Sequence, residues 1–311
     1  MKAVLPALAR PLLEPHLPPA VTPHWFTTRA DAEAAIADAD IAWVDVQSAE
    51  DSAAIAARGE RLRWLSTLRA GIDAYDTATL RRRRTVMTNG TGINAVAVAE
   101  YAVLGILAAA KRYDVVVRLA DRHEWTTTAP GTVELSGSSA LIVGHGTIGR
   151  LIGDRLAAFG VDVTGVTRSG RDGTLTPDQW KQRIGEFDWV VLAAPSTGDT
   201  VASLGADEFA AMKPGAWLIN MARGDMIDQA ALIDALHARR IGGAFLDTVD
   251  PEPLPTDHPL WSAPNALHSM HLSGRSQTTM FSRAAALFLD NLRAFLDGTP
   301  MRNLVDLDAG Y

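Results

Sequence analysis

The 311-residue sequence contains no cysteine. This absence excludes disulfide bonds, catalysis by a thiolate and metal sites with cysteine ligands. We predict no metal site of any other kind. A chain without cysteine fits a reducing compartment, and we expect a cytoplasmic location.

The sequence also lacks an excess of positive charge and a long apolar run. Its formal net charge of −7 gives no electrostatic basis for binding nucleic acid. The run Arg81–Arg84 is interpreted as a solvated helix end, with attraction of an acidic substrate or partner as the alternative.

Early prolines interrupt the apolar N-terminal stretch, so we expect a first strand there rather than a signal peptide. No stretch reaches the ~20 apolar residues of a membrane-spanning helix, and we expect no membrane partner.

Apolar residues make up 47% of the chain and charged residues 21%, as in an ordinary globular protein long enough for two domains. Residues 1–100 predict a small α/β unit, and a long apolar helix follows from Ala95 to Lys111. After it, apolar runs that alternate with helical stretches predict a doubly wound parallel sheet. The six predicted strands are residues 139–143, 161–166, 188–193, 216–220, 244–246 and 266–268.

A glycine motif follows the first of these strands. Gly144, Gly146 and Gly149 have the G-x-G-x-x-G spacing, and the helix that follows leads to a second apolar strand. In a dinucleotide-binding fold these glycines permit a tight turn, a close approach to the pyrophosphate and helix packing. Such turns also occur as plain structure, but the strand–helix–strand context favours dinucleotide binding. The predicted contacts from this loop are Gly144, His145, Gly146, Thr147, Ile148 and Gly149.

The second strand ends without a carboxylate at its tip. An acidic residue there would bind the ribose hydroxyls of NAD and repel the 2′-phosphate of NADP. Arginine can instead pair with that phosphate, so we predict that NADP(H) is preferred, that NAD(H) is possible and that Arg168 is the main phosphate contact. The alternative is that the arginines of this loop are merely solvated. The predicted cofactor contacts beyond the glycine loop are Thr167, Arg168, Ser169, Arg171, Pro195, Ala222 and Asp247.

Three polar stretches follow later strands, at residues 220–225, 247–253 and 268–274. They contain an arginine, carboxylates and histidines, which we expect at one edge of the sheet. Arginine can hold a carboxylate or polarise a carbonyl group, and histidine can transfer a proton when a carboxylate orients it. Each residue alone would be a common surface group, but the set beside a nucleotide site indicates catalysis.

With these stretches and others named below, the sequence resembles the D-isomer-specific 2-hydroxyacid dehydrogenase family over nearly its whole length. The resemblance implies that Arg223, Glu252 and His271 are the catalytic residues, with His268 as a second choice for the histidine. It also implies that backbone N–H groups of Ala70 and Gly71 bind the substrate carboxylate. The family usually has proline before the histidine, where this chain has Met270. The matching stretches are Ala70–Asp73; Asn89 with Val98–Glu100; Gly144–Gly149; Met212–Gly215; Ile219–Asn220 with Arg223–Gly224 and Asp228; Gly243–Ala244 through Asp247 to Glu252–Pro253; His271 with Gly274; and Gly310–Tyr311.

The resemblance further implies an architecture and a reaction. Both domains would be parallel open sheets with flanking helices, and the Rossmann-type domain would be inserted in the substrate domain. Residues 1–97 and 280–311 would form the substrate domain and residues 98–279 the dinucleotide domain. We expect a homodimer that reversibly reduces a small 2-oxo acid to a D-2-hydroxy acid, with glyoxylate or hydroxypyruvate as the family-level substrates. One alternative is a dinucleotide-sensing protein-binding module of the co-repressor type. A methyltransferase or other Rossmann enzyme would leave Arg223, Glu252 and His271 unexplained.

Overall fold

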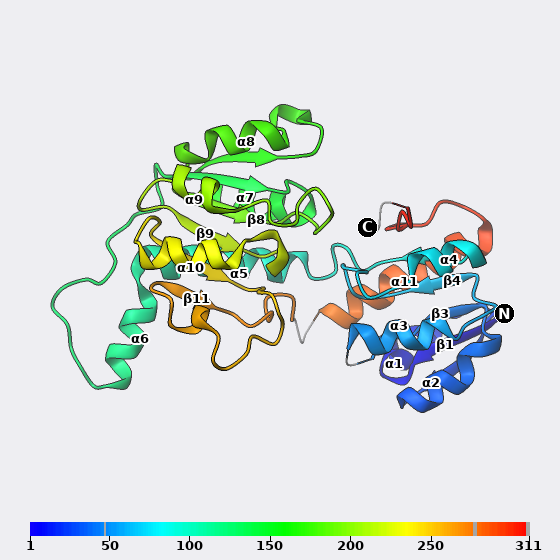
Figure 1. The fold of residues 1–311 in the computed structure, drawn as a ribbon. Helices are drawn as coiled ribbons and strands as arrows, with labels where there is room; N and C mark the ends of the chain where they lie inside the picture. Colours follow the sequence, from blue (N-terminus) through cyan, green and yellow to red (C-terminus); the bar gives the residue numbers. More distant parts are fainter. Residues whose placement is uncertain (47, 276–278, 309–311) are drawn as a thin grey trace. The chain divides into compact units, whose positions relative to one another are not determined.

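The computed structural model describes residues 1–46, 48–275 and 279–308. The chain divides into two compact units, which are described separately below (Figure 1). Unit 1 comprises residues 1–94 and 276–311, and unit 2 comprises residues 95–275. The central part of the chain is therefore inserted between two segments that fold together.

Unit 1 is a five-stranded parallel sheet in the order β2-β1-β3-β4-β5. Helices begin where side chains can cap them: Thr28, Ser48 and Asp76 each accept a backbone N–H from the first turn of α2, α3 or α4. The strands are β1 (Lys2–Pro6), β2 (Thr22–Phe26), β3 (Ile41–Trp43), β4 (Trp64–Ser66) and β5 (Val86–Thr88). The helices are α1 (Arg10–Leu13), α2 (Arg29–Ala35), α3 (Ala49–Ala57), α4 (Thr77–Arg83) and α11 (Met280–Asp297).

The C-terminal helix α11 is joined to this sheet by aromatic packing. Phe288 stacks on Trp43 with ring centroids 5.6 Å apart and on Trp64 with centroids 4.9 Å apart. All three side chains are fully buried. Because burying a large aromatic ring contributes about 1.5–3 kcal/mol, this stack explains why the two ends of the chain form one unit.

Unit 2 is a six-stranded parallel sheet in the order β11-β10-β9-β8-β6-β7. Its first strand, β6, lies between β7 and β8, so the order of the strands reverses beside β6. Ligands of open α/β sheets bind at such a switch point, beyond the carboxyl ends of the strands. The strands are β6 (Ser139–Val143), β7 (Asp162–Val166), β8 (Trp189–Leu192), β9 (Trp217–Asn220), β10 (Gly243–Leu246) and β11 (Ala266–His268).

Alternate residues of these strands enter cores on opposite faces of the sheet. Leu141 packs in the core that also holds side chains of α8, α9 and α10, whereas Ile142 packs in the core with α5 and α7. This alternation is the two-residue period of a strand buried on both sides. The helices are α5 (Ala95–Lys111), α6 (Tyr113–Asp121), α7 (Thr147–Ala158), α8 (Pro177–Arg183), α9 (Ala206–Ala211) and α10 (Gln229–His237).

The predicted fold class is confirmed, including all six strands of unit 2 and the bounds of α5. Strand β2 was not predicted from the sequence. It contains Pro23, which is compatible with a strand only at positions such as the sheet edge that β2 occupies. Helix α11 begins at Met280, and residues 276–278 lie outside the described part of the chain.

Within the ranges given above, the structure contains no helix of the length and hydropathy needed to cross a bilayer. Over the same ranges, no group of histidine and carboxylate side chains is arranged to hold a metal ion.

Candidate active site

The glycine loop after β6 has the close contacts and the open space that a dinucleotide requires. Gly144 has φ +97°, and an added Cβ would lie 2.3 Å from the Ala194 nitrogen after β8. An added Cβ at Gly149 would lie 2.2 Å from the Gly144 oxygen, so the helix packs directly on the loop. Around Gly146, by contrast, no described atom lies within 4 Å of an added Cβ. Gly146 caps α7 without a side chain, which leaves the first N–H groups of the helix for phosphate oxygens.

The end of β7 is tied to this loop through one carbonyl group. The Val166 oxygen accepts hydrogen bonds from the Gly144 nitrogen at 3.2 Å and the His145 nitrogen at 2.8 Å. The residues after Val166 therefore begin beside the glycine loop. Thr167 is half-buried and its hydroxyl bonds that of Thr174 at 2.7 Å, whereas the side chain of Arg168 is exposed. The predicted contacts Ser169 and Arg171 are exposed in the same loop.

The His145 ring packs between β7 and α7. An added Cβ at Gly165 would lie 2.5 Å from His145 Cγ, and one at Gly153 would lie 3.5 Å from His145 Nε2. Burial lowers the pKa of His145, the charge of Arg150 lowers it further and Asp154 opposes both effects. The His145 ring is therefore uncharged at neutral pH and lies beside the glycine loop.

Glu252 and His271 form the central pair of the candidate site. Glu252 Oε2 lies 2.6 Å from His271 Nδ1, and the imidazole is about half exposed. Partial burial acts to raise the pKa of Glu252, but the hydrogen bond and charge of His271, the Val249 N–H and the charge of Arg223 outweigh it. The pKa of Glu252 is therefore lowered, and its carboxylate is ionised at neutral pH. In this pair the carboxylate can fix the orientation of the imidazole.

Arg223 follows β9 and lies near enough to Glu252 for its charge to act on that carboxyl group. Asn220, which is fully buried, holds the backbone around it. Its Nδ2 donates to the Arg223 oxygen at 3.0 Å and to the Thr248 oxygen at 3.2 Å, and its Oδ1 accepts the Ala222 N–H at 3.1 Å. Asn220 thus joins the segment after β9 to the segment after β10.

Asp247 organises the loop that carries His271. Its buried carboxylate accepts hydrogen bonds from the Ser269 hydroxyl, the Leu272 and Ser273 N–H groups and the Ser273 hydroxyl. Its backbone oxygen accepts the His271 N–H at 2.6 Å. Asp247 lies five residues before Glu252 in the sequence, and this spacing does not reveal that it holds the loop. The predicted contact of Asp247 with the cofactor stays a prediction.

The same loop explains how Met270 replaces the family's proline. Met270 has φ +55° and His271 has φ +54°, both in the left-handed region. Proline fixes φ near −65°, so it cannot adopt the conformation of Met270. Each such residue costs on the order of 1–3 kcal/mol, and backbone strain of this kind tends to occur at functional sites. The hydrogen bonds to Asp247 hold both residues in place.

His268, the second choice for the catalytic histidine, lies in a different environment. Its Nε2 is 3.2 Å from the Leu260 oxygen, and its ring centroid is 4.9 Å from that of Trp261. Burial lowers the pKa of His268, and the hydrogen bond to Leu260 opposes this effect. The structure therefore brings His271, and not His268, to Glu252.

The remaining predicted residues lie at strand ends. Pro195 is exposed after β8, and Ala222 is buried after β9. Ala70 and Gly71 follow β4 in unit 1, in a loop whose Ala70 oxygen accepts a hydrogen bond from Asn89 Nδ2 at 2.9 Å. The matching pair Gly310–Tyr311 lies outside the described residues.

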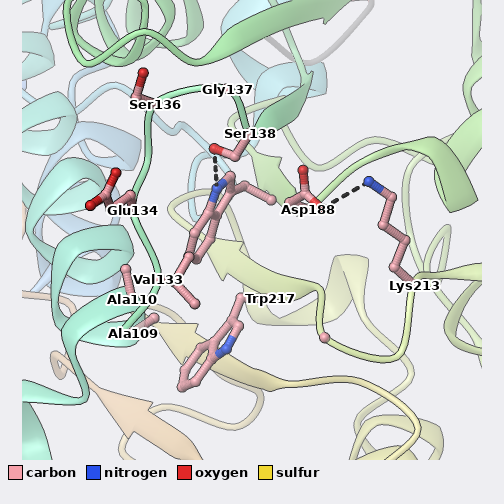
Figure 2. Close-up of a pocket in the computed structure, with 12 residues that line it drawn as sticks. Ala109, Ala110, Val133, Glu134, Ser136, Gly137, Ser138, Asp188, Lys213 and Trp217 are labelled. Carbon is pink, nitrogen blue, oxygen red and sulfur yellow. Dashed lines mark hydrogen bonds and ion pairs between the residues drawn. The ribbon is translucent and has the colours of Figure 1, made fainter. Parts of the chain in front are cut away.

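A cavity of about 430 Å³ lies at the opposite edge of the unit 2 sheet, where β6, β8 and β9 begin (Figure 2). Two pairs of its side chains are bound to each other. Trp189 Nε1 donates to Ser138 Oγ at 3.0 Å, and Lys213 Nζ donates to Asp188 at 2.8 Å. These bonds tie the strand starts together, so we place the candidate site at the carboxyl edge.

Comparison with known proteins identifies the family. The sequence model described as "D-isomer specific 2-hydroxyacid dehydrogenase, NAD binding domain" matches residues 103–273. A glyoxylate/hydroxypyruvate reductase B of Escherichia fergusonii is 32% identical over 256 residues, covering 79% of this chain and 78% of the relative. The reductase B of Enterobacter sp. is 30% identical over 285 residues, covering 88% of this chain and 87% of the relative.

The fold agrees with this match. The crystal structure of a D-isomer specific 2-hydroxyacid dehydrogenase family protein from Aeromonas salmonicida has a TM-score of 0.87 and 28% identity, covering 99% of each chain. The glycine loop described above fits the nicotinamide dinucleotide that this family uses. The protein is an oxidoreductase that acts on the CH–OH group of small 2-hydroxy acids, and the chain belongs to the D-isomer-specific 2-hydroxyacid dehydrogenase family.

Proposed function

We propose that this protein reduces a small 2-oxo acid to a D-2-hydroxy acid with NADPH, and that it can catalyse the reverse reaction. The observation that carries the proposal is the 2.6 Å pair of Glu252 and His271 beside Arg223. The names of the relatives make glyoxylate and hydroxypyruvate the first candidates for the substrate.

Each residue of the site has a role in this reaction. When bound, the dinucleotide supplies a hydride to carbon 2 of the substrate. His271 Nδ1 is engaged by Glu252, so Nε2–H donates the proton to the oxygen of the developing alkoxide. Glu252 holds the imidazole in the orientation that this transfer needs. Arg223 binds the substrate carboxylate and polarises the 2-oxo group.

The preference for NADPH rests on the loop after β7. Arg168 is exposed close to the start of this loop, which the Val166 carbonyl ties to the glycine loop. A hydrogen-bonded pair between arginine and a phosphate contributes on the order of 1.5–3 kcal/mol. At ~1.4 kcal/mol per decade, this corresponds to a preference of roughly tenfold or more. The Arg168→Ala variant should reduce the ratio of kcat/KM with NADPH to that with NADH. Equal wild-type values, or an unchanged ratio in the variant, would contradict the assignment.

A dimer also belongs to this proposal. Helix α6 buries none of its side chains within the described chain, and it exposes Tyr113 and Val117. Trp125 in the following loop is 95% exposed. A second copy of the chain would cover this apolar surface. Light scattering should give twice the mass of the chain, and a monomer at micromolar concentration would contradict this part of the proposal.

The decisive test is the oxidation of NADPH with a panel of 2-oxo acids, using wild type, His271→Ala and His268→Ala. Loss of a general acid should lower the rate of His271→Ala by ~10²–10⁴-fold, and the matched His268→Ala variant should retain most activity. The opposite result would move the catalytic role to His268. Tight dinucleotide binding without turnover of any acid would favour the co-repressor-type alternative, which the retained Arg223 and Glu252 do not suggest.

A further inference from the structure

The loop after β4 in unit 1 is held on one side by a buried carboxylate. Asp45 follows β3, and its side chain is 5% exposed. It accepts the Leu68 N–H at 2.6 Å, the Thr67 hydroxyl at 2.7 Å and the Trp43 indole N–H at 2.8 Å. Burial raises the pKa of Asp45, although these hydrogen bonds and the charge of Arg69 oppose the rise. The Arg69 guanidinium, 3.7 Å away, compensates the buried charge.

The segment after β5 holds the same loop from the other side. The Gly90 N–H donates to the Arg69 oxygen at 2.8 Å, and Asn89 Nδ2 donates to the Ala70 oxygen at 2.9 Å. An added Cβ at Gly90 would lie only 1.9 Å from the Leu68 oxygen, so the two segments are in direct backbone contact. Two successive carbonyl groups of the loop therefore point toward Asn89 and Gly90.

This arrangement decides where the next two N–H groups point. In a trans peptide the N–H is directed opposite to the carbonyl of the same peptide plane. The Ala70 N–H shares a plane with the Arg69 carbonyl, and the Gly71 N–H shares one with the Ala70 carbonyl. Both N–H groups are thus turned away from the segment after β5. Successive N–H groups that face one side form a concave anion site.

We propose that Asp45 and Asn89 are positioning residues that turn the Ala70 and Gly71 N–H groups toward the substrate carboxylate. The inference rests on the proposed function, because it assigns the anion to the 2-oxo acid. Asp45 sets the path of the chain as it leaves β4, and Asn89 sets the rotation of the Ala70–Gly71 peptide. Neither side chain needs to touch the substrate.

The test is an NMR titration of the full-length protein, labelled with ¹⁵N in alanine and glycine, in the presence of NADP⁺. The probe is oxamate, an unreactive amide analogue of a 2-oxo acid. In wild type the Ala70 and Gly71 amide signals should shift with oxamate. Asn89→Ala should weaken the fitted Kd about tenfold, equivalent to ~1.4 kcal/mol, with an unchanged Kd for NADPH.

Two further variants separate positioning from a general loss of structure. Asn303→Ala is the matched control, because Asn303 Nδ2 donates to the Asn89 and Thr91 oxygens at 3.2 and 2.7 Å and not to the loop after β4. Its Kd for oxamate should equal that of wild type. Asp45→Asn keeps the side-chain shape and should weaken oxamate binding in the same direction as Asn89→Ala.

Turnover assays of the same variants distinguish failure of this inference from failure of the proposed function. In an active enzyme, Asn89→Ala should raise KM for the 2-oxo acid more than it lowers kcat. The wild-type protein could reduce no 2-oxo acid and still show the oxamate shifts, with weaker oxamate binding in Asn89→Ala. That result would support the inference and overturn the proposed reaction. If oxamate shifts neither amide signal, or if Asn89→Ala and Asn303→Ala weaken oxamate binding equally, the inference is wrong.

Discussion

Replacing Asp247 by alanine should detach the loop that carries His271. The carboxylate accepts hydrogen bonds from two hydroxyl groups and two backbone N–H groups of residues 269–273. Hydrogen bonds to a charged group contribute about 1.5–3 kcal/mol each. Together they exceed the strain of Met270 and His271, which is on the order of 1–3 kcal/mol per residue. Without the carboxylate the strain is no longer opposed, and the loop should relax.

The expected result is a loss of turnover, because a relaxed loop separates His271 from Glu252. The rate should fall ~10²–10⁴-fold, the range for removing a general acid, and should match that of His271→Ala. The matched control is Asp247→Asn, which keeps the shape and one accepting oxygen. The Ser273 hydroxyl can reverse and accept from the new amide, so this variant should lose less than about tenfold, or ~1.4 kcal/mol.

The assay combines kcat for a 2-oxo acid, NADPH affinity by fluorescence and urea unfolding to compare stability. Positioning through the loop predicts that Asp247→Ala lowers kcat while the Kd for NADPH stays within a fewfold of wild type. The reasoning is refuted if the variant instead binds NADPH much more weakly and retains kcat at saturating cofactor. That outcome would support the contact between Asp247 and the cofactor that the sequence predicts.

Four further predictions concern the candidate site and the glycine loop. Because the pKa of Glu252 is lowered, its ionised form and the stability it contributes should persist at neutral pH and be lost as the pH falls through that lowered value. In Glu252→Gln the His271 imidazole loses the charged hydrogen bond that orients it, so kcat should fall about tenfold or more, equivalent to ~1.4 kcal/mol, while the Kd for NADPH stays unchanged; an unchanged kcat contradicts the pairing. Met270→Pro should lower both melting temperature and kcat because its φ is +55°, whereas Met270→Gly should preserve them; tolerance of proline would refute the loop conformation. Gly165→Ala should cost about 1–3 kcal/mol in urea unfolding by displacing His145, and an unchanged midpoint would show that the ring does not pack there.

The sequence alone was sufficient for the parts of the fold that repeat a local pattern. The strand–glycine–helix–strand unit from Ser139 to Val166 was predictable because apolar period, glycine spacing and helix stop agree within about thirty residues. Helix α5 was predicted to its exact ends, since its apolar run is long and uninterrupted. The edge strand β2 was missed because Pro23 argues against a strand unless the position in the sheet is known.

Only the tertiary structure decided which side chains work together. Local pattern does not separate His268 from His271, and only the family resemblance ranks His271 first; parallel pairing places His268 beside Leu260, while the following loop carries His271 to Glu252. The role of Asp247 likewise depends on donors 22 to 26 residues later in the chain. Local periodicity carries no information on contacts between the ends of different strands. Those contacts arise because parallel strands bring all their carboxyl ends to one edge of the sheet, where residues distant in the sequence share one site.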